Sequence, residues 1–247
     1  MSAKPLNKRA YGHIAHLPNS RMGPGDHHCH EGQAVICTEK ARDWKDVVIV
    51  QEKLDGSNCC VAKLDDGKIV ALTRAGYEAS TSPYEQHHIF ARWVRRFESL
   101  FYDILDSGER MCGEWLAQAH GTRYKLPHGP FVPFDILKGD ERLNYDQFAP
   151  RALHADFRIP RLISYGQPIS VKAVLKQLQI SGHGAIDPVE GAVWRVEREG
   201  RVDFLAKYVR PEKIDGLYLP RISGKEEVWN WTERPAQDSK ATGETGA

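Results

Sequence analysis

The sequence lacks any hydrophobic run long enough to span a membrane. Its first twenty residues carry Lys4, Lys8 and Arg9 but no apolar core of signal-peptide length. These absences argue against the membrane and secreted classes. We therefore expect a cytoplasmic protein that has no membrane partner.

A strong charge of either sign is also missing. Lys and Arg number 34 against 33 Asp and Glu, which gives a formal net charge of +1. A protein without a global basic field attracts a polyanion only through a local patch. Any contact with nucleic acid must therefore depend on a few well-placed cations.

Cysteine is scarce and irregularly spaced. The five cysteines are odd in number and form no CxxC pair; they are Cys29, Cys37, Cys59, Cys60 and Cys112. This pattern argues against a disulfide framework or a zinc ribbon, and it favours reduced thiols that are mostly buried.

The chain does contain enough apolar residues for a core, since 41% of its 247 residues are hydrophobic. Residues 1–33 are rich in Gly, Pro and His without clear periodicity, which predicts an irregular arm. We expect residues 34–234 to form the folded domain. The small polar tail 235–247 is expected to be disordered.

Short β-prone runs dominate the middle of the chain. They predict an α+β fold built on antiparallel sheet, with hairpins around the turns at 65–67 and 198–200. Strands are predicted at 47–50, 58–64, 68–74, 110–116, 130–137, 189–197 and 201–209, and helices at 84–105, 145–155 and 170–178.

The stretch QEKLDGSN, residues 51–58, places Lys53 between two predicted strands, at the mouth of the interior. Lysine is a nucleophile only when neutral, and burial together with nearby cations lowers its pKa. Gly56 would let the backbone approach a ligand closely, while Glu52 and Asp55 could orient the amine, bind a metal or read a base. Taken alone, KxDG arises by chance in roughly one of twenty chains of this length, and a hairpin turn with surface charges is the alternative.

Further charged residues lie in strands that should be buried. They are Glu114, Asp135, Glu190, Arg195 and Lys207. Buried charge is unfavourable unless it is paired or meets a ligand. These strands therefore predict one shared site.

Five short motifs in this order resemble those of the covalent nucleotidyltransferases, which include ATP-dependent DNA ligases, RNA ligases and messenger RNA capping enzymes. The motifs are Lys53-Leu-Asp-Gly56, Gly113-Glu-Trp115, Phe134-Asp-Ile136, Glu190-Gly-Ala-Val193 and Leu205-Ala-Lys207. The resemblance implies a nucleotidyltransferase (ATP-grasp-like) domain of antiparallel sheets flanked by helices. Asn58, where DNA ligases and capping enzymes usually have Arg, and the downstream Arg74 are similar to the RNA ligase 2 group.

This resemblance implies an ATP-dependent RNA ligase that uses Mg²⁺ or Mn²⁺. Lys53 would attack the α-phosphate of ATP to form lysyl-AMP, the AMP would pass to an RNA 5′-phosphate, and an RNA 3′-hydroxyl would displace it. Phosphoryl transfer depends on positioning and charge neutralisation, so such a site needs both carboxylates and fixed cations.

The resemblance also implies roles for individual residues. Lys53, Glu190 and Lys207 would be catalytic, with Glu190 as the metal ligand. ATP would be bound by Glu52 at the adenine amino edge, Phe134 by stacking, Glu114 at the ribose, Arg74 and Lys207 at phosphate or sugar, Asn58 at phosphate, and by Asp55, Gly56 and the supporting Asp135.

Two departures from the family pattern keep other functions open. Leu205 occupies the first lysine position of the fifth motif, unless Lys207 itself is the first and Val209 replaces the second. In either case one phosphate contact is missing unless Arg210 or Lys213 supplies it. Residues 211–247 are too short for the C-terminal domain of related ligases, which implies a minimal ligase or a protein partner that grips RNA. The alternatives are a DNA ligase or guanylyltransferase, and a nucleotide-binding sensor without sealing activity.

Some polar and aromatic segments have no assigned role. The His-rich stretch 26–31 could bind zinc, contact an RNA end or phosphate, or form an ordinary loop. The basic face of the helix predicted at 84–105 could bind RNA or be solvated. Tyr77, Tyr84 and Trp115 could stack on a nucleotide or fill the core.

Overall fold

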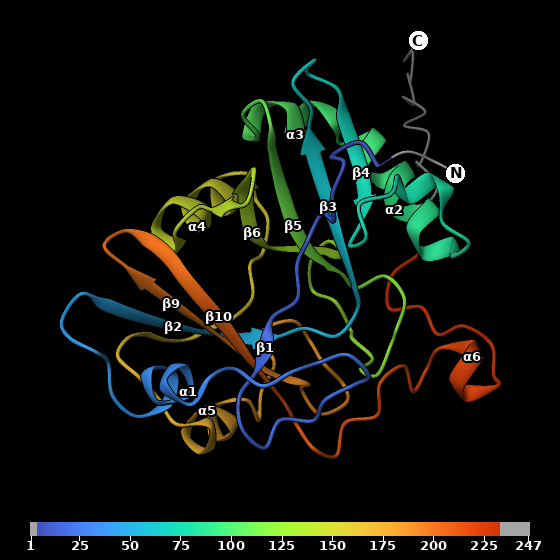
Figure 1. The fold of residues 1–247 in the computed structure, drawn as a ribbon. Helices are drawn as coiled ribbons and strands as arrows, with labels where there is room; N and C mark the ends of the chain where they lie inside the picture. Colours follow the sequence, from blue (N-terminus) through green and yellow to red (C-terminus); the bar gives the residue numbers. More distant parts are fainter. Residues whose placement is uncertain (1–3, 233–247) are drawn as a thin grey trace, which may run out of the picture.

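The computed structural model describes residues 4–232, which form two five-stranded sheets (Figure 1). Sheet A has the strand order β1-β10-β9-β2-β8. Within the described chain its pairings are antiparallel, except for the short parallel pair of β1 with β10. Its strands are β1 (Ala15–His16), β2 (Asp46–Lys53), β8 (Leu162–Gly166), β9 (Gly191–Arg198) and β10 (Arg201–Val209).

Sheet B has the strand order β4-β3-β5-β6-β7, and its pairings are antiparallel. The hairpins predicted for β3 with β4 and for β9 with β10 are confirmed, as is the α+β fold class. The strands of this sheet are β3 (Ser57–Lys63), β4 (Ile69–Thr73), β5 (Glu109–Trp115), β6 (Phe131–Lys138) and β7 (Glu141–Arg142).

Helices cover one face of each sheet (Figure 1). Helices α1 (Glu31–Thr38) and α5 (Val171–Gln177) pack on sheet A, where Cys37 and Val174 join the core around Trp194. Sheet B is covered by α2 (Glu85–Arg96), α3 (Glu98–Ile104) and α4 (Tyr145–His154). The 3₁₀ turn η1 (Ala79–Thr81) precedes α2, and α6 (Pro220–Ser223) lies near the end of the described chain.

The single helix predicted over 84–105 is wrong, because the chain breaks at Phe97 into α2 and α3. Phe97 has φ −108° and ψ 23°, outside helical geometry. The break still leaves Trp93 and Phe101 in contact, with ring centroids 5.8 Å apart. Apolar spacing continues through the break, so periodicity alone could not reveal the change of direction.

The N-terminal arm is packed against the domain. Ala10 and Tyr11 are buried on the face of sheet B opposite α2, beside Leu72 and Cys112. Farther along, β1 extends sheet A beside β10. The arm therefore contacts both sheets, whereas the predicted disordered tail 235–247 lies outside the described residues.

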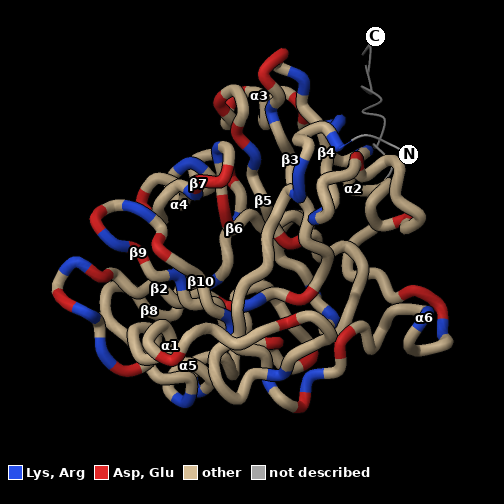
Figure 2. Tube along the Cα trace, in the orientation of Figure 1, with Lys and Arg blue, Asp and Glu red and all other residues tan. Residues whose placement is uncertain are grey.

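Charge and thiol chemistry agree with the composition. Positions of Lys and Arg are interspersed with those of Asp and Glu along the backbone in Figure 2. All five cysteines are free, and four of them are buried. No helix within residues 4–232 is long and apolar enough to cross a membrane.

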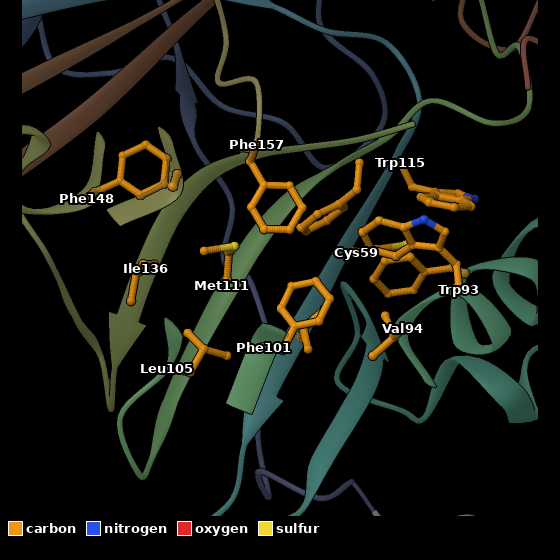
Figure 3. Packing of buried hydrophobic residues seen from close by; sticks show 14 of the residues in the cluster. Cys59, Trp93, Val94, Phe101, Leu105, Met111, Trp115, Ile136, Phe148 and Phe157 are labelled. Carbon is orange, nitrogen blue, oxygen red and sulfur yellow. The ribbon is translucent and has the colours of Figure 1, made fainter. Parts of the chain in front are cut away.

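Aromatic side chains fill the core between sheet B and its helices (Figure 3). Trp93 contacts Trp115 with ring centroids 5.5 Å apart, and Phe101 stacks on Phe157 at 5.6 Å. Phe101 has no exposed surface. This core holds β5 and β6 in place, and these strands carry part of the site described below.

We expect Phe101→Ala to lower the free energy of unfolding by about 3–5 kcal/mol, because it removes a fully buried aromatic ring and leaves a cavity. Trp44 is 88% exposed, so Trp44→Ala is the matched control, with a change within about 0.5 kcal/mol. Urea unfolding followed by circular dichroism measures both, and equal effects would contradict the packing described here.

Candidate active site

A cavity of about 1050 Å³ opens between strands of the two sheets. The chain crosses it at residues 54–56, because Lys53 ends β2 in sheet A and Ser57 begins β3 in sheet B. The structure brings every predicted site residue to its wall: Glu52, Lys53, Asp55, Gly56, Asn58, Arg74, Glu114, Phe134, Asp135, Glu190 and Lys207.

Lys53 forms an ion pair with Glu190. Its Nζ lies 2.6 Å from Glu190 Oε2 and also donates to the backbone oxygen of Leu54 at 3.3 Å. The strand register explains the pairing, because Lys53 faces Gly191, the neighbour of Glu190, across β2 and β9. Glu190 is buried, so the pair is largely withdrawn from water.

The direction of the Lys53 pKa shift corrects the expectation that this pKa is lowered. Burial does lower it, but the carboxylates of Glu190 and Glu114 outweigh that effect and raise the pKa of Lys53 well above its ordinary value. The free protein therefore holds Lys53 as an ammonium ion. The amine must lose a proton before it can attack phosphorus.

Glu114 and Glu190 form an acidic pair around Lys53. Burial, opposed by Lys53 and reinforced by the charge of Glu190, raises the pKa of Glu114 to about 7. Burial also raises the pKa of Glu190, and Lys53 opposes that rise. A cation bound beside two buried carboxylates stabilises their ionised forms, which burial disfavours.

The donors present fit a divalent cation that keeps water ligands. Among residues 4–232 no cluster of three or more His, Cys, Asp and Glu side chains could hold a metal. Mg²⁺ prefers oxygen ligands, and one or two carboxylates with phosphate oxygens and waters are enough for it. The same finding leaves the His-rich stretch 26–31 without a zinc site in the described structure.

Gly56 is required by the protein backbone. A Cβ at this position would lie 2.5 Å from the carbonyl oxygen of Trp115 in β5. Gly56 thus permits a close approach to sheet B, and because it also lines the cavity, its approach to a ligand stays a prediction. The Gly56 amide donates to Glu114 Oε1 at 2.9 Å, which fixes this carboxylate beside the crossing.

Asp55 and Lys213 clamp the crossing to a neighbouring loop. Asp55 Oδ2 lies 3.0 Å from Lys213 Nζ, and it accepts hydrogen bonds from the Gly121 amide at 3.0 Å and the Thr122 hydroxyl at 3.2 Å. Lys213 also donates to the Gly121 carbonyl and to Thr122. Neither Lys213 nor Arg210 lines the cavity, and Lys213 is paired with Asp55 instead.

Asp135 ties the two sheets together. Its Oδ1 accepts from Arg195 of β9 at 2.5 Å, and its Oδ2 accepts from Tyr11 of the arm at 2.6 Å and from Arg142 at 3.2 Å. Arg195 continues to Glu197 at 2.6 Å. A buried charge with this many partners positions β6 against β9.

Glu52 is held by a loop that precedes β9. Its two carboxylate oxygens accept from the Ser181 hydroxyl at 2.5 Å and from the Gly182 amide at 2.8 Å. Each oxygen retains a second lone pair that can accept from a ligand. Burial raises the pKa of Glu52, while the Ser181 and Gly182 bonds oppose the rise.

Asn58 and Arg74 carry polar atoms that lack protein partners. Asn58 Oδ1 and Arg74 Nε are buried without a hydrogen bond, although both residues line the cavity. Arg74 is held through its Nη2, which donates to the Gly12 carbonyl of the arm at 2.9 Å. Buried orphan atoms at a cavity wall are the positions that a bound ligand would satisfy.

Lys207 is contacted by the arm as well. Its Nζ lies 3.6 Å from Asp26 Oδ1, and Asp26 Oδ2 lies 3.0 Å from His16 Nε2. Burial and the charge of Lys53 lower the pKa of Lys207, and Asp26 opposes this shift. Sequence reasoning missed the contacts of Tyr11, Gly12 and Asp26, because an arm without periodicity gives no signal of where it packs.

The rim of the cavity includes two of the three aromatic residues for which nucleotide stacking and core packing were both predicted. Tyr77 and Tyr84 are 42% and 50% exposed there, whereas Trp115 is fully buried in the core. Sequence reasoning also missed that Ser57 and His87 meet at the wall, where Ser57 Oγ lies 2.8 Å from His87 Nε2. The basic face of α2, formed by Arg92, Arg95 and Arg96, does not line the cavity.

Two largely antiparallel sheets thus enclose a lysine beside acidic side chains. The RNA ligase family model matches residues 46–209, about two thirds of the chain. The chain belongs to this family. No curated protein sequence matches it.

Solved structures of the Naegleria gruberi RNA ligase share the fold. Naegleria gruberi RNA ligase with PPi has a TM-score of 0.54 and 17% identity, with 88% of this chain and 63% of that chain covered. A mutant of that ligase with ATP and Mn has a TM-score of 0.51 and 15% identity, covering 80% and 60%. An archaeal ATP-dependent RNA ligase has a TM-score of 0.47 and 22% identity, covering 67% and 43%. This chain thus spans less than two thirds of the length of these ligases.

We expect Asp135→Asn to lower the free energy of unfolding by about 1.5–3 kcal/mol, because it removes the buried carboxylate that joins Arg195 of one sheet to β6 of the other, while Glu197 remains a counter-ion of Arg195. Asp140→Asn is the matched control, since Asp140 pairs with Lys8 at the surface, where its side chain is 90% exposed. That control should change stability little. If chemical unfolding of both variants gave the same midpoint, Asp135 would not connect the sheets.

Proposed function

We propose that this protein is an ATP-dependent RNA ligase that joins RNA 5′-phosphate and 3′-hydroxyl ends through lysyl-AMP and adenylylated RNA. The observation that carries the proposal is that Lys53, paired with Glu190 at 2.6 Å, lines the same cavity as Asn58 and Arg74, which carry buried orphan atoms. Membership of the RNA ligase family supports it. So do the related structures described as holding ATP and Mn, or PPi.

The nucleotide would lie across the crossing between the sheets. Phe134 would stack on adenine and Glu52 would accept from its amino group, while Glu114 would bind the ribose. Arg74, Lys207 and Asn58 would contact phosphate or sugar, and Asp55, Gly56 and Asp135 would hold the wall that these residues form. All these side chains or backbone groups line one cavity, which is what a single bound ATP requires.

Glu190 is the residue that would hold Mg²⁺ or Mn²⁺. A divalent cation at this position would neutralise charge on the phosphates during transfer. Within the protein, Glu190 Oε2 accepts a hydrogen bond from Lys53 Nζ at 2.6 Å. This bond fixes the position of the amine and stabilises its protonated form before the attack. Asp135 and Arg195 keep the two sheets at a constant separation around the phosphates.

The sensor function, which binds nucleotide without transfer, predicts no covalent adduct. A DNA ligase or guanylyltransferase predicts activity on DNA ends or with GTP. A protein partner that grips RNA stays a prediction, because the described residues offer no test of it. The experiment below separates these functions from the proposed one.

Lys53→Ala should abolish covalent attachment of AMP, because it removes the nucleophile. Intact mass of the purified protein after incubation with ATP and Mg²⁺ or Mn²⁺ measures this directly, with GTP as the nucleotide control. Lys68→Ala is the matched lysine control, since Lys68 is exposed in the turn between β3 and β4 and does not line the cavity. An adduct that persisted on Lys53→Ala protein would sink the assignment.

Glu190→Ala should retain the nucleophile but slow adduct formation by about 100-fold or more, because it removes the proposed metal ligand. Wild-type protein that carries the adduct should seal RNA ends in preference to DNA ends. An adduct formed at the wild-type rate by Glu190→Ala would remove Glu190 from the catalytic set.

The rate of adduct formation should rise as pH increases from about 6 to about 9. The pKa values of Glu114 and Lys53 are both raised, and both shifts favour a faster reaction at higher pH. The pKa of Glu114 is raised to about 7, so acid protonates the carboxylate that would accept from the ribose. The pKa of Lys53 is raised above its ordinary value, so the small fraction of neutral amine grows with pH throughout this range. Quenched-flow or manual quench assays at constant ionic strength measure the profile. A rate that fell with rising pH over this range would contradict the proposed state of Lys53.

A further inference from the structure

The chain turns back over the mouth of the cavity after β10. In this return segment, residues 210–222, five residues line the cavity: Asp215, Gly216, Leu219, Arg221 and Ile222. The RNA ligase family match ends at residue 209, so the segment lies outside it. Figure 1 shows it leading away from β10 toward α6.

Several contacts fix the return segment in place. Lys213 is bound to Asp55, and Asp215 pairs with Arg21 at 2.8 Å. The Tyr218 amide donates to the His120 carbonyl at 2.7 Å, and the Arg123 guanidinium lies 5.0 Å from the Tyr218 ring centroid. A residue three positions beyond Tyr218 is therefore held at the mouth by the fold itself.

Arg221 is the cation of this wall that has nothing to bind. Among the residues that the structure describes, no hydrogen bond or ion pair reaches its guanidinium, and it is exposed at the mouth. The other cations of the wall each have an acceptor: Lys53 has Glu190, Arg74 has the Gly12 carbonyl, Arg195 has Asp135, and Lys207 has Asp26. An arginine without a partner is suited to bidentate binding of phosphate oxygens.

The geometry of the first step decides which phosphates those are. An attacking amine and the leaving group lie roughly in line on phosphorus. Lys53 is in the wall and only 22% exposed, so pyrophosphate departs toward the mouth, where Arg221 is. His120 lines the same cavity as Lys53 and Arg221, and its carbonyl accepts from the Tyr218 amide, so the return segment that carries Arg221 is joined to this wall.

We propose that Arg221 binds the β- and γ-phosphates of ATP during the transfer to Lys53, and that it has no part in sealing. This inference rests on the proposed function. In the step concerned, the Nζ–P bond to the α-phosphate forms and the bond from the α-phosphorus to the bridging oxygen breaks. The electron pair leaves with pyrophosphate. Nζ starts as an ammonium ion and gives up two protons to solvent, one before the attack and one as the N–P bond forms.

The test compares full-length wild-type protein with Arg221→Ala, Arg221→Lys and the control Lys225→Ala, which lies next to α6 and does not line the cavity. Adduct formation from ATP is followed by quenching and intact mass. Arg221→Ala should slow it about 10- to 100-fold, the range for losing a hydrogen bond to a charged group. Arg221→Lys should recover part of the rate, and Lys225→Ala should match wild type.

Two further measurements distinguish an effect on AMP transfer from ATP from an effect on folding or on sealing. Isolated lysyl-AMP protein is treated with PPi, and Arg221→Ala should need a correspondingly higher concentration to lose its AMP. Pre-adenylylated RNA bypasses ATP, so its sealing by Arg221→Ala should equal that of wild type.

Wild-type adduct rates in Arg221→Ala, or an equal loss with pre-adenylylated RNA, would overturn the inference. The second result would assign Arg221 to RNA or to folding instead. A wild-type protein that forms no adduct at all would contradict the proposed function, and the inference with it. Failure of Arg221 alone leaves the wild-type adduct intact, so the two failures are distinguishable.

Discussion

The ion pair between Lys53 and Glu190 is the interaction on which the rest of the site depends. It joins the end of β2 to the start of β9 inside a cavity, where neither charge is well solvated. A buried pair of this kind is stable only while each partner keeps the other, and removal of either leaves an uncompensated charge. The Gly56 amide brings Glu114 to the same place, so the two carboxylates and the lysine form one electrostatic unit.

This unit accounts for both the resting state and the chemistry. With two acidic neighbours, Lys53 remains an ammonium ion in the free protein, which limits its reaction with other electrophiles. In the proposed function, nucleotide phosphates would add negative charge to the cavity, which Arg74, Lys207 and Arg221 line. The two sheets must keep these groups at fixed distances. Asp135 contributes to this by connecting β6 to Arg195 of β9.

Much of this could be predicted from the sequence, because the motifs are local. Lys53, Glu114, Glu190 and Lys207 come from short strands whose apolar residues fix their register, and their order along the chain was enough to place them at one wall. The arm and the return segment could not be predicted, since their contacts join residues far apart and follow no period. The pKa of Lys53 was also beyond sequence reasoning. Its sign depends on the distance from Nζ to carboxylates that lie 61 and 137 positions along the chain.

The most direct test of this account is to locate the nucleotide on the protein. Peptide mapping by tandem mass spectrometry, after incubation with ATP and a divalent cation, would show which side chain carries AMP. The account predicts AMP on Lys53, with every other lysine unmodified. AMP on another residue, or ATP bound without any covalent product, would contradict it.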